Sequence, residues 1–141
     1  MGKIYTSLGL MSGTSMDGID ASIIKSNGED KYEVILDQYF KYDEEIYKKL
    51  VNIRNKISSL KDLEINSAAL ADIERKITLF HAYVCKKIIN ENSNNIDLIG
   101  FHGQTILHNA DKKISKQLGD AHLLSGLLKK KVIYNFRKND M

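Results

Sequence analysis

Residues 8–20 read Leu-Gly-Leu-Met-Ser-Gly-Thr-Ser-Met-Asp-Gly-Ile-Asp, and they predict more about this chain than any other stretch. An apolar strand, a turn rich in glycine, hydroxyl and aspartate residues, and a second apolar strand follow one another directly. Turns of this composition can bind phosphates, because glycine lets the backbone approach a ligand while N–H groups and hydroxyls donate hydrogen bonds. An ordinary polar turn has the same composition, so the residues alone leave both interpretations open.

The turn does not fit the P-loop pattern. Gly13 and Gly18 have the spacing of its two glycines, yet Ile19 and Asp20 stand where lysine and serine or threonine are required. The residues that follow alternate between apolar and polar, which predicts a second strand and therefore a hairpin, without a helix dipole to offer to a phosphate. Asp17 and Asp20 would repel a triphosphate, so a phosphate site here requires a hard divalent cation, Mg²⁺, bound directly or through water.

The composition is that of an ordinary globular domain. The chain has 141 residues and a net charge of +3, and its lysines are mostly spread among acidic residues. This predicts a single domain over residues 1–141 with a solvated surface and no nucleic-acid site. Cys85 is the single cysteine, which excludes an internal disulfide and predicts plain packing in a buried helix. No apolar run has the length of a membrane span and no signal peptide is evident, so we expect a cytoplasmic protein that does not bind membranes.

Apolar periodicity predicts an α/β fold. Its mixed sheet should open with a three-stranded antiparallel meander and be flanked by helices. After the opening hairpin, the expected elements are a strand at 32–42, a helix at 43–57, a longer helix whose apolar face runs from 70 to 88, a buried strand at 96–101 that ends in polar residues, short strands on either side of 109–113, a helix at 121–128 and a strand at 132–136.

Three motifs in the same order resemble those of the anhydro-N-acetylmuramic acid kinases, sugar kinases of the actin-like superfamily. They are the opening signature at 8–20, Gly-Phe-His-Gly-Gln-Thr at 100–105, and a block at 117–140 with Leu-Gly-Asp and Asn-Phe-Arg-Lys-Asn-Asp. The resemblance implies an actin-like ATPase or ribonuclease-H-like lobe. It also implies an enzyme that uses ATP and Mg²⁺ to phosphorylate 1,6-anhydro-N-acetylmuramic acid, with ring opening to N-acetylmuramic acid 6-phosphate, in peptidoglycan recycling of the cell wall.

By this resemblance the opening turn holds the phosphates of ATP. Asp17 and Asp20 are expected on the Mg²⁺ side of the phosphates, where carboxylate oxygens are suitable ligands. The residues expected to contact the phosphates are Gly13, Thr14, Ser15, Met16, Asp17, Gly18, Ile19 and Asp20.

The sugar is expected beyond the buried strand at 96–101, because open α/β sheets bind ligands at the carboxyl ends of their strands. His102, Gln104 and Thr105 carry polar groups that suit sugar hydroxyls. Arg137 could pair with the lactyl carboxylate of a muramic acid in bidentate fashion, and Asp140 is counted with the same group. The alternatives are a structural histidine that caps the strand and a surface ion pair between Arg137 and Asp140.

The resemblance is to the N-terminal lobe of these kinases. Their catalytic aspartate and adenosine pocket belong to a second lobe, expected beyond residue 141, so no catalytic residue is expected in this chain. Asn135 stands where the family usually has aspartate, which removes a charge. Two hypotheses follow. The chain is half of a split kinase whose C-terminal lobe is a separate polypeptide, or it is an inactive remnant or phosphate-binding module that retains at most weak phosphate binding. A homodimer is the alternative partner that would cover the exposed face.

Overall fold

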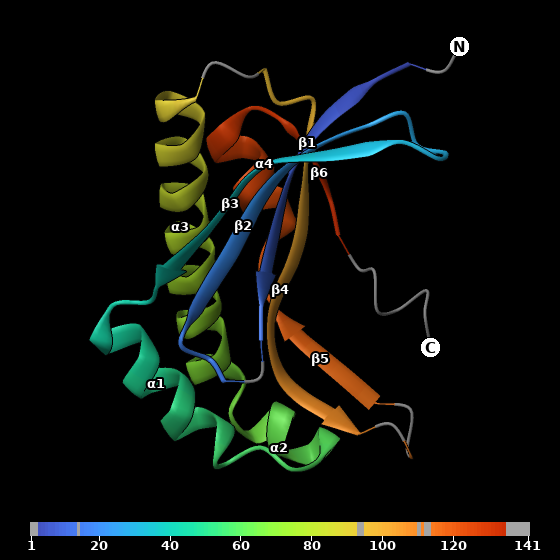
Figure 1. Ribbon diagram of the computed structural model, residues 1–141. Helices are drawn as coiled ribbons and strands as arrows, with labels where there is room; N and C mark the ends of the chain where they lie inside the picture. The colour runs from blue at the N-terminus through green and yellow to red at the C-terminus, as the bar shows by residue number, and fades with distance from the viewer. Residues whose placement is uncertain (1–2, 14, 93–94, 110, 112–113, 135–141) are drawn as a thin grey trace.

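The computed structural model describes residues 3–13, 15–92, 95–109, 111 and 114–134. Figure 1 shows a twisted sheet with the long helix α3 packed along it and the shorter helices α1 and α2 at one end. The elements are β1 (Tyr5–Ser12), β2 (Gly18–Ser26), β3 (Tyr32–Lys41), α1 (Glu44–Arg54), α2 (Leu60–Ile65), α3 (Ser67–Glu91), β4 (Leu98–Asn109), β5 (Ile114–Leu118), α4 (Ala121–Leu128) and β6 (Lys131–Ile133).

The sheet is mixed. Its strands lie in the order β3-β2-β1-β4-β5, and β6 pairs with the first part of β4. β1, β2 and β3 form an antiparallel meander, whereas β4 runs parallel to β1. Helices α1, α2 and α3 connect β3 to β4, which supplies the long crossover that a parallel strand needs. The expected mixed sheet with an opening meander and flanking helices, as in an actin-like lobe, is confirmed.

One hydrophobic core lies between the sheet and the helices. Leu8 and Leu10 of β1 are buried, while Tyr5 and Met11 of the same strand are exposed by 42% and 60%. The core that contains Leu8 and Leu10 also contains apolar side chains of α1, α3 and α4. Because successive side chains of a strand point to opposite faces, these three helices all pack on the Leu8 face of the sheet.

The other face of the sheet has small residues along its middle. The register places Gly9 of β1 beside Ser22 of β2 and Gly100 of β4. Asp20 lies on this face nearer the β1–β2 turn, and its register partner on β3 is the exposed residue Tyr39. One of the two aspartates expected at a metal is therefore on the sheet face opposite the helices.

The start of α1 follows strong capping signals. Asp43 accepts a hydrogen bond at Oδ1 from the backbone N–H of Ile46, at 2.9 Å, which satisfies one of the exposed donors of the first turn. Glu44 and Glu45 occupy that turn, where the helix dipole favours acidic side chains. The chain therefore turns from β3 into α1 at a defined residue, immediately after Tyr42.

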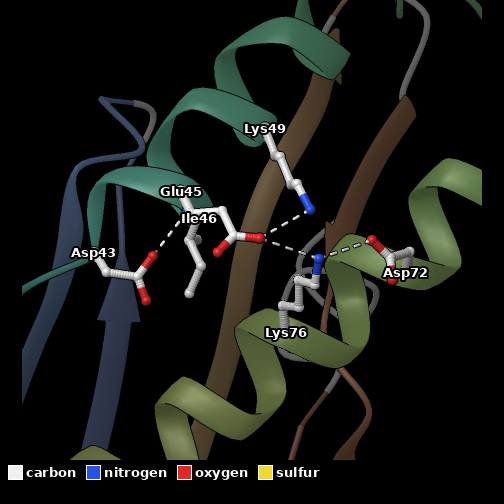
Figure 2. Close-up of polar contacts among 6 residues, drawn as sticks. All are labelled: Asp43, Glu45, Ile46, Lys49, Asp72 and Lys76. Carbon is white, nitrogen blue, oxygen red and sulfur yellow. Dashed lines mark hydrogen bonds and ion pairs between the residues drawn. The ribbon is translucent and has the colours of Figure 1, made fainter.

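An exposed ion-pair network connects α1 with α3, as Figure 2 shows. Glu45 of α1 lies 3.1 Å from Lys49 and 3.5 Å from Lys76 of α3, and Lys76 lies 3.2 Å from Asp72. Ion pairs in solvent add little to stability. The position of α1 is therefore determined mainly by its buried face, with Leu50 fully inaccessible at its centre.

Three details differ from the sequence prediction. The polar stretch after residue 57 contains the short helix α2, capped by the Ser59 hydroxyl, which accepts from Asp62 N–H at 3.3 Å. β4 continues through residues 102–105, which we expected to follow the strand as polar end residues, and β5 pairs with Gln104 and Thr105 of this stretch. β6 ends at Ile133, and residues 135 and 136 of the expected last strand lie outside the described part.

Two titratable residues of α3 lie in the core. Cys85 is fully buried, and burial raises the pKa of its thiol to about 12, in agreement with a packing role. His81 is also fully buried, with Nδ1 2.8 Å from the carbonyl oxygen of Ile77 and its ring edge-on to Phe101. Burial lowers the pKa of His81 to about 4, so the ring is neutral at pH 7. No helix within the described ranges has the length and apolar character needed to cross a bilayer.

Acidification should destabilise the fold through His81. Histidine in the unfolded chain takes up a proton near pH 6.5, whereas folded His81 stays neutral down to about 4, so the unfolded state binds more protons in this window. The contribution of neutral His81 to the free energy of unfolding is fully present above pH 6.5. It should decrease towards pH 4, by about 3 kcal/mol at most. Urea unfolding between pH 4 and 7 measures this slope. His81→Leu should remove the His81 share of it, and equal slopes for both proteins would contradict the assignment.

Candidate phosphate-binding site

The turn between β1 and β2 is held from the interior at both ends. Near its start, Nε2 of Gln104 on β4 donates a hydrogen bond to the carbonyl oxygen of Gly13 at 2.8 Å. At its end, the backbone N–H of Tyr42 donates to the carbonyl oxygen of Asp17 at 2.9 Å. Within the turn, the N–H of Met16 donates to the same Gly13 oxygen at 3.2 Å. These bonds define the backbone path of the turn.

Two members of the predicted phosphate-contact set have their side chains in the core. Met16 has a φ of 61° and a side chain that is 2% exposed, so burial of its thioether offsets the cost of a left-handed backbone. Ile19 is fully buried at the start of β2. Any contact from these two residues to a phosphate therefore has to come from the backbone.

The outer side of the turn is organised around Asp17. Ser15 Oγ donates to Asp17 Oδ1 at 2.8 Å, and the hydroxyl of Tyr39 on β3 hydrogen-bonds to the same carboxylate. These two bonds lower the pKa of Asp17, so the carboxylate is ionised at neutral pH. Desolvation and the bond to Asp17 raise the pKa of Tyr39 to about 12, so Tyr39 remains a protonated donor.

Asp17 and Asp20 lie around the same tyrosine. Asp20 is the register partner of Tyr39, and the charges of both aspartates act on the Tyr39 hydroxyl. The described residues hold no cluster of three or more histidine, cysteine or acidic side chains that could bind a metal by themselves. Two carboxylates suit Mg²⁺, which typically binds through one or two carboxylates, substrate phosphates and waters. The donors present therefore fit the implied ion.

The two glycines of the turn differ in their surroundings. A Cβ at Gly18 would collide with the carbonyl oxygen of Phe40 and the ring of Tyr39, so the packing of β3 itself requires glycine there. A Cβ at Gly13 would meet only Ser15 Oγ, at 3.9 Å, and the backbone of Gly13 is not left-handed. Among the described residues nothing requires glycine at position 13, which leaves space there for close approach by a ligand.

Three of the residues expected to contact the sugar are described, and their side chains differ in solvent accessibility. Gln104 is 0% exposed and Thr105 is 4% exposed, and Thr105 Oγ1 accepts a 3.4 Å hydrogen bond from Gln117. His102 is half-buried. Of these three side chains, His102 has the most surface to offer to a ligand. Four residues of the sequence prediction lie outside the described ranges: Thr14, Asn135, Arg137 and Asp140.

A bulge in β4 turns Gln104 towards the interior. In a regular strand, residues three apart face opposite sides, yet Phe101 and Gln104 are both buried. The pairing with β1 shifts between Phe101 and the Ser12–Gln104 pair, and Gly103 has a φ of 81° at this point. The glycine of the His-Gly-Gln-Thr motif thus redirects the next side chain beneath the β1–β2 turn.

Sequence reasoning did not single out Tyr39 and Tyr42, which both contact the turn. The predicted meander contained a signal for Tyr39, because an antiparallel third strand must bring its last residues beside the first residues of the second strand. The contact of Tyr42 with β4, across 62 residues of sequence, has no such local signal.

The mixed sheet, with a glycine- and hydroxyl-rich turn between its first two antiparallel strands, defines the class of protein as an actin-like lobe. The chain matches the family model for anhydro-N-acetylmuramic acid kinase over residues 5–141, and it belongs to that family. It is 63% identical over its whole length to the anhydro-N-acetylmuramic acid kinase of Pelagibacter ubique and 37% identical to that of Agrobacterium fabrum. It covers 38% and 39% of those two proteins, which is about two fifths of their length.

Gly18→Ala should disturb both stability and Asp17. The added methyl group must displace the Tyr39 ring or the Phe40 carbonyl, and overpacking of this kind costs about 1–3 kcal/mol. Loss of the Tyr39 hydrogen bond should move the pKa of Asp17 back towards its ordinary value. Urea unfolding and an NMR titration of the Asp17 carboxyl measure the two effects. Gly126→Ala is the control, because its Cβ would meet no atom within 4 Å, and it should leave both quantities unchanged or slightly raise stability.

Proposed function

We propose that this chain, residues 1–141, is the N-terminal lobe of an ATP-dependent kinase that phosphorylates 1,6-anhydro-N-acetylmuramic acid. The reaction opens the anhydro ring to give N-acetylmuramic acid 6-phosphate and serves peptidoglycan recycling. Membership of the kinase family supports the reaction class. The observation that carries the proposal for this chain is the β1–β2 turn, which is braced from within and presents the ionised Asp17 on its outer side.

In this proposal the turn binds the phosphates of ATP. Gly13 leaves room for an oxygen to approach the backbone, while Ser15 and Tyr39 hold the Asp17 carboxylate in place. Asp17 and Asp20 hold Mg²⁺, directly or through water. When bound, Mg²⁺ neutralises charge on the phosphates and on the transferred phosphoryl group. The side chains of this chain therefore hold the cation in place, and the cation would neutralise the phosphates.

The sugar side is proposed to involve His102, Thr105, Arg137 and Asp140. His102 has accessible surface, and an arginine would suit the lactyl carboxylate of the substrate. Gln104 is assigned differently from the sequence expectation. Its side chain is 0% exposed and bonds to the turn, so we propose that it supports the phosphate site and does not contact the sugar.

Catalysis is proposed to need a second lobe with the carboxylate base and the adenosine pocket. The chain spans about two fifths of the length of its relatives, and in actin-like kinases the nucleotide lies between two lobes. Exposed apolar side chains on the sheet face opposite the helices, such as Met11 and Tyr5, are consistent with a further polypeptide or a second copy binding there.

Complementation tests the proposed function. We expect no kinase activity from the chain alone, and Mg-ATP-dependent formation of N-acetylmuramic acid 6-phosphate after addition of the part of the Pelagibacter ubique enzyme that the chain does not match. Mass spectrometry of the sugar product gives the readout. Asp17→Asn should abolish the restored activity, because an amide cannot balance the charge of Mg²⁺. A folded chain that binds Mg-ATP but stays silent in the mixture would instead be a phosphate-binding module, and one that neither binds nor reacts would contradict the proposal.

Gly13→Ala separates ligand binding from folding. The new methyl group has space in the protein, so the free energy of unfolding should stay within about 0.5 kcal/mol of wild type. If a phosphate approaches the backbone at this point, the affinity for Mg-ATP should fall several-fold. Titration calorimetry and urea unfolding of the same samples measure the two quantities, with Gly126→Ala as the matched substitution away from the turn. Unchanged affinity in Gly13→Ala would place the phosphates elsewhere.

A further inference from the structure

Three buried polar side chains beneath the turn form one hydrogen-bonded chain. Ser12 Oγ lies 3.1 Å from the hydroxyl of Tyr42, and that hydroxyl donates to Gln104 Oε1 at 3.2 Å. Gln104 Nε2 in turn donates to the carbonyl oxygens of Gly13, at 2.8 Å, and Thr105, at 3.2 Å. The three side chains are at most 2% exposed.

The directions of these bonds follow from the number of protons. The tyrosine has one hydroxyl proton, which goes to Gln104, so Ser12 must donate to Tyr42. Both Nε2 protons of Gln104 are used by carbonyl oxygens, and its Oε1 receives the Tyr42 proton. A flipped Gln104 amide would place Oε1 against two carbonyl oxygens. Only one orientation of the amide therefore satisfies all the hydrogen bonds of Ser12, Tyr42 and Gln104.

We propose that Tyr42 is a positioning residue of the phosphate turn, acting through Gln104. Its hydroxyl donates a hydrogen bond to the buried Oε1 atom of Gln104, and this orients the amide so that Nε2 donates to the carbonyl oxygen of Gly13. That oxygen is thereby directed into the protein, so the negative end of the Gly13 carbonyl dipole does not face an incoming phosphate. The backbone N–H of Tyr42 holds the other end of the turn at Asp17, so one residue acts on both ends.

Without the hydroxyl, Gln104 has a buried acceptor without a partner. Burying an unpaired polar atom is costly, so the amide should rotate or admit water, and either change weakens its bond to Gly13. The turn should then open more often at the Met16 N–H, which donates to the same Gly13 oxygen. The ring of Tyr42, edge-on to Phe80 at 5.2 Å between centroids, would still pack in Tyr42→Phe.

The test compares Tyr42→Phe with Ser125→Ala in the full chain. Ser125→Ala also removes a partly buried hydroxyl bond, to the Lys130 carbonyl at 2.7 Å, but this bond lies next to β6, which pairs with the first residues of β4, whereas Gln104 is in the middle of that strand. Both variants should be destabilised to a similar extent in urea. Only Tyr42→Phe should accelerate hydrogen exchange at the Met16 amide, by roughly fivefold, as expected for loss of one hydrogen bond. Equal exchange at Met16 in the two variants would overturn the proposal.

Binding of Mg-ATP is a separate readout, because the role of the turn as a phosphate site rests on the proposed function. Tyr42→Phe should weaken binding several-fold and Ser125→Ala should leave it unchanged. If the wild-type chain does not bind Mg-ATP, the proposed function fails, while the exchange at Met16 still decides the positioning role. If Tyr42→Phe does not fold, the positioning role is tested by hydrogen exchange in the wild-type protein. The Nε2 protons of Gln104 should exchange slowly with solvent, and fast exchange would refute the proposal.

Discussion

The parallel pairing of β1 with β4 is the constraint on which the rest of the structure depends. It places Ser12, the last residue of β1, beside Gln104 on β4, although they are 92 positions apart in the chain. Paired strands lie about 4.8 Å apart, so side chains at these neighbouring positions can act on the same ligand or on each other. The same pairing makes β1 the centre of the sheet, with Leu8 and Leu10 in the core.

The β1–β2 turn has an inner and an outer side with different physical roles. On the inner side, Tyr42 and Gln104 form hydrogen bonds away from water, where a satisfied polar network is rigid and an incomplete one is costly. On the outer side, Asp17 is ionised and exposed, held by Ser15 and Tyr39. The backbone conformation is thus determined from within the fold, while the charge is left accessible to a cation.

Glycine serves three different purposes in the motifs of this one chain. Gly18 makes room for Tyr39 and Phe40, and Gly103 adopts a positive φ that turns Gln104 inward. Gly13 has neither reason among the described residues, so its free space faces a ligand in our proposal. Counting glycines in a turn could not have separated these purposes, because they depend on the backbone conformation at Gly103 and on the atoms that surround the Cα atoms of Gly13 and Gly18.

The sequence by itself determined the order and type of most elements, the antiparallel meander and the family. Apolar alternation and periodicity are local properties, and the three motifs stand at recognisable positions in the chain. Residues 102–105 were expected as accessible polar end residues and instead continue β4, with Gln104 under the turn, because pairing with β5 and the bulge at Gly103 override the local pattern. The roles of Tyr42, Tyr39 and buried His81 were likewise decided only by tertiary structure. Hydrogen bonds and desolvation act between residues that meet in space, and the spacing of residues along a chain does not specify which side chains those will be.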